Sequence, residues 1–218
     1  MAERLVNIYT RFERFWHWAQ ALLIFVLMFT GLGLHGMHHL LYFGQAVTLH
    51  TIAAVALMVL WVFAIFWHLT TGTWKHYVPR LEGLWKMVRF YGYGVFKCEP
   101  APYHKGYWRK HNPLQVLAYL SLKLVLFPLM WVSGIAYLTY NFWQPGTADA
   151  SWKLELIANA HLISGYLIAS FVVLHVYLLT VGHFFEHLRP MVTGVEKVDL
   201  SPEEEAYLEA DEPYRLKG

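Results

Sequence analysis

Histidine is the residue type that could do chemistry at several places in this chain. Two of its 13 histidines, His161 and His175, lie 14 residues apart in one long apolar stretch. On an α-helix this separation falls about 40° short of four full turns, so both side chains leave nearly the same face. It also corresponds to about 21 Å along the helix axis, which is too far for one metal ion to bind both. The spacing therefore predicts two separate ligand positions.

Two further histidines could complete these positions. His17 lies near the start of the first apolar stretch and His50 near the start of the second. If the stretches cross a membrane in alternating directions, depth pairs His50 with His161 on the outer side and His17 with His175 on the inner side. Two imidazoles on one iron are typical of haem b held between helices, so we expect two haem b groups. The chain contains no C-x-x-C-H motif, which excludes covalently attached c-type haem.

Two alternatives remain for the histidines. His68 competes with His17, because His50 and His68 share a helix face. However, a rise of about 27 Å from His50 would place His68 roughly 6 Å beyond the level of His175, so we prefer His17. The four histidines could also be polar groups hydrogen-bonded inside the protein. An ionisable residue within a membrane is costly and usually functional, which favours ligation.

Small residues accompany the proposed ligands. Gly31 follows His17 by 14 residues, and Ala64 follows His50 by the same interval. Ser164 and Gly165 lie one turn from His161. A small residue would let a flat macrocycle approach the helix backbone, but close helix packing uses the same residues.

Four apolar stretches must position these side chains. Hydrophobic residues make up 57% of the chain and charged residues 15%, against about 45–50% and 25% in soluble domains. Each stretch is long enough to cross a bilayer, which takes about 20 residues. We predict an all-α fold, an integral membrane four-helix bundle, with a kink at Pro128. The expected spans are residues 15–34, 47–67, 114–140 and 154–181.

Lysine and arginine predict the orientation. They are concentrated in the N-terminal segment and in the long segment between the second and third spans, whereas the other two connections carry only Lys153. This asymmetry places both termini and the long loop in the cytoplasm of a bacterial inner membrane, as a multi-pass protein. No small-residue cleavage pattern follows the first stretch, so we expect a span there and not a signal peptide.

Two segments lie outside the spans. Leu81, Leu84, Trp85 and Val88 share one helical face, which predicts an interfacial amphipathic helix in the long inner loop. We divide the chain into a membrane domain at residues 1–190 and an acidic cytoplasmic tail at residues 191–218. The tail should contain a short solvated helix that Ser201 caps. The net charge of +2 is too small to indicate nucleic-acid binding.

These residues resemble a known family, the four-span di-haem cytochrome b subunits of nickel–iron hydrogenases and formate dehydrogenases (bacterial cytochrome b561-like). The chain looks closest to the cytochrome b subunits associated with thiosulfate reductases. His-Trp after a basic start and His-x13-His in the fourth span carry the resemblance, which extends over residues 11–188. The matching runs are RFERFWHWAQALLIFVLMFTGL, NPLQVLAYLSLKLVLFPLMWVSGIAYL and AHLISGYLIASFVVLHVYLL.

The resemblance implies His17, His50, His161 and His175 as haem ligands in the pairing above. It also implies a quinone site (menaquinone or ubiquinone) beside the inner haem, at Asn112 and His175, with Gln115 one turn further on. Asn112 could equally be a helix N-cap before Pro113. The implied partner is a periplasmic redox subunit, such as an iron–sulfur or multihaem protein or a hydrogenase or molybdoenzyme complex.

Lys123 is a further charge within the third span. A haem propionate would neutralise it, and an aqueous cavity is the equal alternative. Iron with two histidine ligands has no open coordination position, so we expect electron transfer and no activation of a bound substrate. We therefore expect a membrane-anchoring subunit that links a periplasmic redox protein to quinone. The alternatives are a stand-alone cytochrome b, such as a quinone-linked superoxide oxidase, and a non-redox transport or assembly protein.

Overall fold

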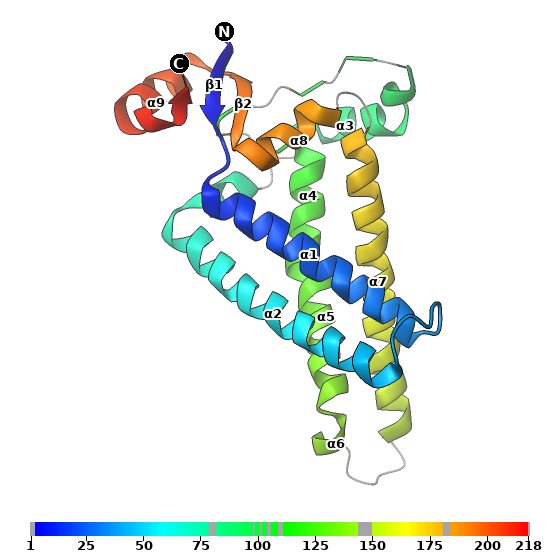
Figure 1. Ribbon diagram of the computed structural model, residues 1–218. Helices are drawn as coiled ribbons and strands as arrows, with labels where there is room; N and C mark the ends of the chain where they lie inside the picture. Colours follow the sequence, from blue (N-terminus) through cyan, green and yellow to red (C-terminus); the bar gives the residue numbers. More distant parts are fainter. Residues whose placement is uncertain are drawn as a thin grey trace. The chain divides into compact units, whose positions relative to one another are not determined.

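The computed structural model describes residues 3–78, 82–97, 99–100, 102–103, 106–108, 111–143, 150–180 and 184–217. The chain forms two compact units, whose helices and strands are labelled in Figure 1. Unit 1 comprises Met1–Val116 and Leu179–Gly218, and unit 2 comprises Leu117–Leu178.

Four long apolar segments match the predicted spans. In unit 1, helices α1 (Arg11–Leu34) and α2 (Phe43–Thr70) pack against each other as a hairpin. The third segment runs through α4 (Pro113–Ser121), η3 (Leu122–Leu126) and α5 (Phe127–Leu138), and the fourth is α7 (Ala150–Thr180). All four are long and apolar enough to cross a membrane, which confirms the prediction of four candidate spans.

The start of α1 is fixed by local hydrogen bonds. Thr10 caps the helix by accepting a hydrogen bond from the Glu13 N–H, and the Glu13 carboxylate accepts one from the Thr10 N–H. This reciprocal pair satisfies two backbone donors that the first helical turn leaves without partners. Helix α8 (Phe184–Thr193) adds two contacts, because Trp18 Nε1 donates to the Met191 carbonyl and Arg14 donates to that of Val192. These contacts hold the first two turns of α1, which carry His17, in place within unit 1.

The third segment changes its helical form directly before Pro128. Residues Leu122–Leu126 are π-helical, and the Phe127 N–H bonds to the Leu122 carbonyl five residues earlier. Proline has no N–H, and its ring crowds the carbonyl four residues back, so a wider preceding turn accommodates it. We predicted a kink at Pro128, and the structure has a π-helical turn directly before it.

A small antiparallel sheet corrects the all-α prediction. Strand β1 (Glu3–Asn7) lies between β2 (Val195–Asp199) and β3 (Leu216–Lys217), in the order β2-β1-β3. Glu3 pairs with Asp199 and Asn7 with Val195. The strands are two to five residues long, so their alternation of polar and apolar residues is too short to stand out beside the long apolar helices.

The sheet has its own hydrophobic core. Helix α9 (Pro202–Asp211) packs on it, capped by Ser201 as predicted, with Leu208 fully buried. We call β1, β2, β3, α9 and residues 106–108 the sheet module. The helix expected to be solvated therefore buries one face, while the division into residues 1–190 and 191–218 stays a prediction. The core consists of Val6, Ile8, Tyr107, Val198, Leu200 and Leu208.

The long segment between α2 and α4 contains the predicted amphipathic helix, α3 (Leu84–Gly92). Met87 is buried on one side, whereas Trp85 is 81% exposed on another. Leu81 lies outside the described residues. Short helices flank α3 and follow α5 and α9; they are η1 (Thr73–Tyr77), η2 (Gly94–Lys97), α6 (Tyr140–Trp143) and η4 (Pro213–Arg215).

Candidate functional site

His50 lies in the second turn of α2 and faces α1. Its Nδ1 is 2.8 Å from the hydroxyl oxygen of Thr30, a side chain with no exposed surface. A Cβ added at Gly31 would lie 3.7 Å from Cε1 of the imidazole, which is an ordinary contact. Gly31 therefore lies beside the proposed ligand, at the depth predicted from the sequence.

His161 has a matching environment within unit 2. Its Nδ1 is 3.2 Å from the hydroxyl oxygen of Ser133 on α5, which is buried. A Cβ added at Gly134 would lie 3.1 Å from Cε1 of His161, so the imidazole approaches this backbone closely. Sequence reasoning missed Ser133 and Thr30. Both precede a glycine within an apolar span, which is the signal that could have identified them.

The positions of His17 and His68 along α1 and α2 do not show which of them is the better candidate ligand. The His68 ring lies 5.3 Å from that of Trp16, edge to face, so His68 is level with the residue that precedes His17. His68 is buried, and its Nδ1 is 2.6 Å from the Ala64 carbonyl. His68 therefore lies level with the start of α1, and its position along the helix does not exclude it in favour of His17.

His175 lies near the end of α7 and stacks on the aromatic ring one turn earlier. The ring centroids of His175 and Phe171 are 5.8 Å apart with an angle of 18° between the planes, and Tyr119 packs edge-on against Phe171. Apart from this stacking, the His175 side chain is exposed. Another small residue predicted near a ligand, Gly165, lies against Met130 and so contributes to packing between α5 and α7.

Asn112 and Gln115 form a reciprocal cap at the start of α4. The Asn112 side-chain oxygen accepts from the Gln115 N–H at 2.8 Å, and the Gln115 side-chain oxygen accepts from the Asn112 N–H at 3.1 Å. Asn112 is buried, and its amide nitrogen donates to the Tyr91 hydroxyl at 3.1 Å. Burial raises the pKa of Tyr91, so this hydroxyl stays neutral. The capping alternative is thus realised in the structure.

A cavity of about 480 Å³ lies beside this cap in unit 1. His111, Pro113 and Val116, which flank Asn112 in sequence, contribute to its lining. Met87 and Trp108 add apolar surface, and polar groups come from the segment between α2 and α4. Apolar walls with a few polar groups are typical of small-molecule sites.

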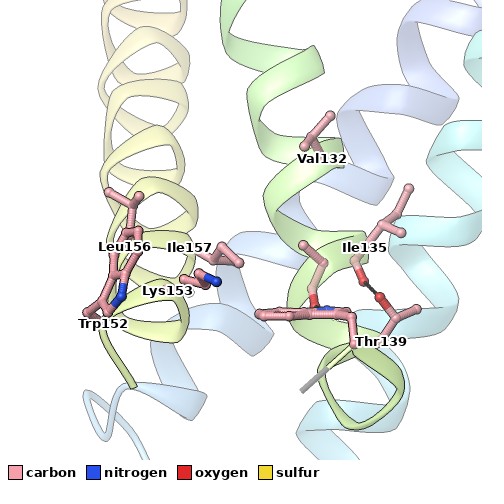
Figure 2. Close-up of a pocket in the computed structure, with 9 residues that line it drawn as sticks. Val132, Ile135, Thr139, Trp152, Lys153, Leu156 and Ile157 are labelled. Atoms are coloured by element: carbon pink, nitrogen blue, oxygen red, sulfur yellow. Dashed lines mark hydrogen bonds between the residues drawn. The ribbon is translucent and has the colours of Figure 1, made fainter. Parts of the chain in front are cut away.

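A second cavity, of about 520 Å³, lies between the end of α5 and the start of α7 (Figure 2). Its walls are almost entirely apolar; α7 contributes Trp152, Lys153 and Ile157, the last of which lies one turn before His161, and α5 contributes the opposite wall. Thr139 turns its hydroxyl back to the Ile135 carbonyl at 2.7 Å. None of the candidate ligand residues lines this cavity, so it is separate from the candidate site.

Lys123 lies within η3, in the middle of the third segment, and is partly buried. It thus occupies the one π-helical turn of the described helices. Such turns are often found at functional sites, because they redirect side chains.

Comparison with known proteins identifies relatives. Residues 8–194 match the family model described as prokaryotic cytochrome b561. A protein of Escherichia coli (strain K12) named "Putative cytochrome YdhU" is 27% identical over 206 residues, covering 88% of this chain and 75% of its own length. No solved structure matches the chain significantly.

Proposed function

The chain belongs to the prokaryotic cytochrome b561 family, and from this premise we propose that it is a membrane-anchoring subunit that carries electrons between a periplasmic redox partner and the quinone pool. Its family and its four apolar helices make it a membrane di-haem cytochrome b of electron transport. The non-redox alternative does not hold for a member of this family.

The proposed haem ligands are His50 with His161 and His17 with His175. One observation carries the first of these pairs. The imidazoles of His50 and His161 lie in apolar helices and are each held through Nδ1 by a buried hydroxyl. A histidine that binds a metal usually fixes its second ring nitrogen in this way, so the residues present fit an iron porphyrin. His68 remains the alternative to His17, since it is held through Nδ1 by a backbone carbonyl.

The haem groups would supply reversible one-electron chemistry. This chain's own residues fix their level in the membrane, because His161 and His175 are separated by about 21 Å along α7. Moving a charge across the whole membrane is worth about 2.3 kcal/mol per 100 mV. With a hydrocarbon core of about 30 Å, two electrons crossing between these levels correspond to about 3 kcal/mol per 100 mV.

The proposed quinone site, for menaquinone or ubiquinone, lies at Asn112 and Gln115. The cavity of about 480 Å³ beside their cap supports it. Asn112 already holds the start of α4 and the Tyr91 hydroxyl, so it would act by fixing the wall of the site as well as by any contact with a quinone carbonyl. Lys123 is the proposed partner of a haem propionate.

The proposed orientation has both termini and the long inner loop in the cytoplasm. The sheet module supports it, because β1 pairs with β2 and β3, and Tyr107 from the inner loop packs in the same core. The three segments that the charge distribution assigns to one side are thus in contact with one another. The proposed partner on the periplasmic side is an iron–sulfur or multihaem protein, or a hydrogenase or molybdoenzyme complex.

A stand-alone quinone-linked oxidase is the second candidate function. Isolation in mild detergent separates the two. A subunit would co-purify with a redox protein and require it for quinone reduction or quinol oxidation, whereas a stand-alone oxidase would be active as a single chain.

The ligand assignment is tested by haem quantification on the purified protein. We expect two haem b per chain, and about one after His161→Ala or after His175→Ala. The control His39→Ala, an exposed histidine between α1 and α2, should retain two. His17→Ala should leave one haem and His68→Ala two. Two haems in both the His161 and His175 variants would contradict the assignment, and the reverse result at positions 17 and 68 would select His68.

A further inference from the structure

We propose that Thr30 and Ser133 are paired positioning residues, which orient the two axial histidines of the outer haem and lower its redox potential. This inference rests on the proposed function, because it assumes that His50 and His161 bind one iron. It goes beyond that function by assigning roles to two hydroxyls that neither bind iron nor contact a substrate.

The first of two chains of hydrogen bonds, which we call relays, runs from His50 through the Thr30 hydroxyl to the Val26 carbonyl, between α2 and α1. The Thr30 hydroxyl oxygen is 2.8 Å from the carbonyl oxygen of Val26, one turn earlier, and 2.8 Å from Nδ1 of His50. A carbonyl oxygen can only accept, so the single hydroxyl proton points to Val26. The hydroxyl oxygen then accepts from His50, which requires that Nδ1 of the imidazole carries the proton.

The second relay repeats this arrangement between α5 and α7. The Ser133 hydroxyl oxygen is 2.6 Å from the Leu129 carbonyl, again one turn earlier, and 3.2 Å from Nδ1 of His161. The same reasoning gives Ser133 as donor to its own helix and as acceptor from Nδ1–H of His161. Each relay therefore runs from imidazole to hydroxyl to a backbone carbonyl of the neighbouring helix.

Burial makes these relays effective. Thr30 has no exposed surface and Ser133 is 5% exposed, so water does not compete for their hydroxyls. In both cases the next residue is a glycine that faces the imidazole edge; a Cβ would crowd His161 at Gly134, whereas at Gly31 it would make an ordinary contact with His50. The same hydroxyl–glycine pair thus occurs on two different helices, each time against a histidine.

The relays determine which imidazole nitrogen carries the proton and how strongly the imidazole donates electrons. With Nδ1 protonated, Nε2 is the nitrogen whose lone pair points toward iron. An Nδ1–H that donates a hydrogen bond makes the imidazole a stronger electron donor. Stronger donation stabilises ferric over ferrous iron, so both relays should hold the potential of the outer haem down.

The test uses the purified two-haem cytochrome and matched variants. Thr30→Val keeps the shape and removes the hydroxyl, Thr30→Ser keeps the hydroxyl, and Ser133→Ala removes the second one. Potentiometric titration resolves the two haems, and low-spin ferric EPR reports the orientation of the axial ligands.

We expect Thr30→Val and Ser133→Ala each to retain two haems and to raise the midpoint potential of the same component. The double variant should raise it further, and Thr30→Ser should titrate as the wild type does. Selective loss of one haem in Thr30→Val, with Thr30→Ser intact, would also support the role of the hydroxyl.

Unchanged potentials and EPR signals in fully loaded Thr30→Val and Ser133→Ala would overturn the inference while leaving the proposed function standing. Shifts in two different components would show that His50 and His161 bind different irons, which overturns it as well. A wild-type protein without haem would instead refute the proposed function itself.

Discussion

The glycine next to each relay hydroxyl differs in how closely it approaches its histidine. A Cβ at Gly134 would lie 3.1 Å from Cε1 of His161, whereas a Cβ at Gly31 would lie 3.7 Å from Cε1 of His50. The first distance requires the imidazole to move and the second does not. The two positions thus form a matched pair for substitution.

We predict that Gly134→Ala weakens binding of the outer haem and that Gly31→Ala does not. The alanine methyl group at 134 would displace His161 by a few tenths of an ångström, which is enough to weaken an axial bond and the hydrogen bond to Ser133. Haem content should fall from two per chain toward one in Gly134→Ala and stay at two in Gly31→Ala. Equal haem content in both variants would contradict this reading of the close approach.

At the residue scale, the sequence revealed the histidines but not the groups that hold them. The 14-residue interval between His161 and His175 could be interpreted because an α-helix has a fixed pitch. Thr30 and Ser133 could not be identified, since their partners lie on neighbouring helices and sequence periodicity does not report which helices face each other. His17 and His68 could not be separated by counting rise, because α1 and α2 bring Trp16 and His68 to one level.

At the element scale, the cap of α4 is the feature on which the proposed quinone site depends. Asn112 and Gln115 satisfy each other's backbone N–H groups, and Pro113 occupies the first helical position, where its missing N–H has no cost. A motif that caps a helix can also shape a cavity wall, so the two roles need separate measurements.

We predict that Asn112→Ala lowers stability by about 1 kcal/mol, the usual cost of losing an N-cap. Asn112→Asp keeps the oxygen that accepts from the Gln115 N–H, but it loses the N–H that donates to Tyr91, whose hydroxyl must then donate to the carboxylate; it should lose less stability than Asn112→Ala. Thermal unfolding followed by haem absorbance measures this effect. Quinone affinity, measured on the same variants, reports the second role. A loss of affinity in Asn112→Asp at unchanged stability would assign the side-chain amide to the quinone.

The turn before Pro128 illustrates what a sequence discloses about elements. Proline predicts that the helical ladder is interrupted, because the N–H is absent. It does not predict whether the helix bends or widens, since that depends on what packs against the turn. The structure has a π-helical turn that contains Lys123.

At the scale of the whole molecule, the sheet module joins segments from three parts of the chain. Its core should respond to a cavity as the core of a soluble domain does. We predict that Leu208→Ala, at a fully buried position, destabilises the module by about 2–5 kcal/mol. Limited proteolysis should then release the C-terminal segment, with the haem spectrum unchanged.

The exposed neighbour Glu209 provides the control, and Glu209→Ala should resist the protease as the wild type does. Equal resistance of Leu208→Ala and Glu209→Ala would mean that the module contributes no cooperative stability of its own.

The module should also weaken in alkaline solution. Burial, together with a hydrogen bond from its hydroxyl to the Glu212 carboxylate, raises the pKa of Tyr107 above its ordinary value of 10.0. A raised pKa means that the folded state holds the proton more tightly than the unfolded state. The resulting stability is therefore complete below pH 10 and declines as pH rises further.

Tyr107→Phe removes this ionisation. It should cost about 1 kcal/mol at neutral pH through the lost hydrogen bond, yet lose less stability than the wild type above pH 10. Proteolysis across a pH series measures both effects. Parallel pH profiles for the two proteins would indicate that Tyr107 does not titrate with unfolding.

The strand order of the sheet constrains how the protein is made. β1 leaves the ribosome before all four spans, whereas β2 and β3 follow the last of them, yet β1 is the central strand. Its two edges can therefore be paired only after the fourth apolar helix has been made. In the proposed orientation, a chain inserted with one span missing would have β1 and β2 on opposite faces of the bilayer, so the sheet could not form.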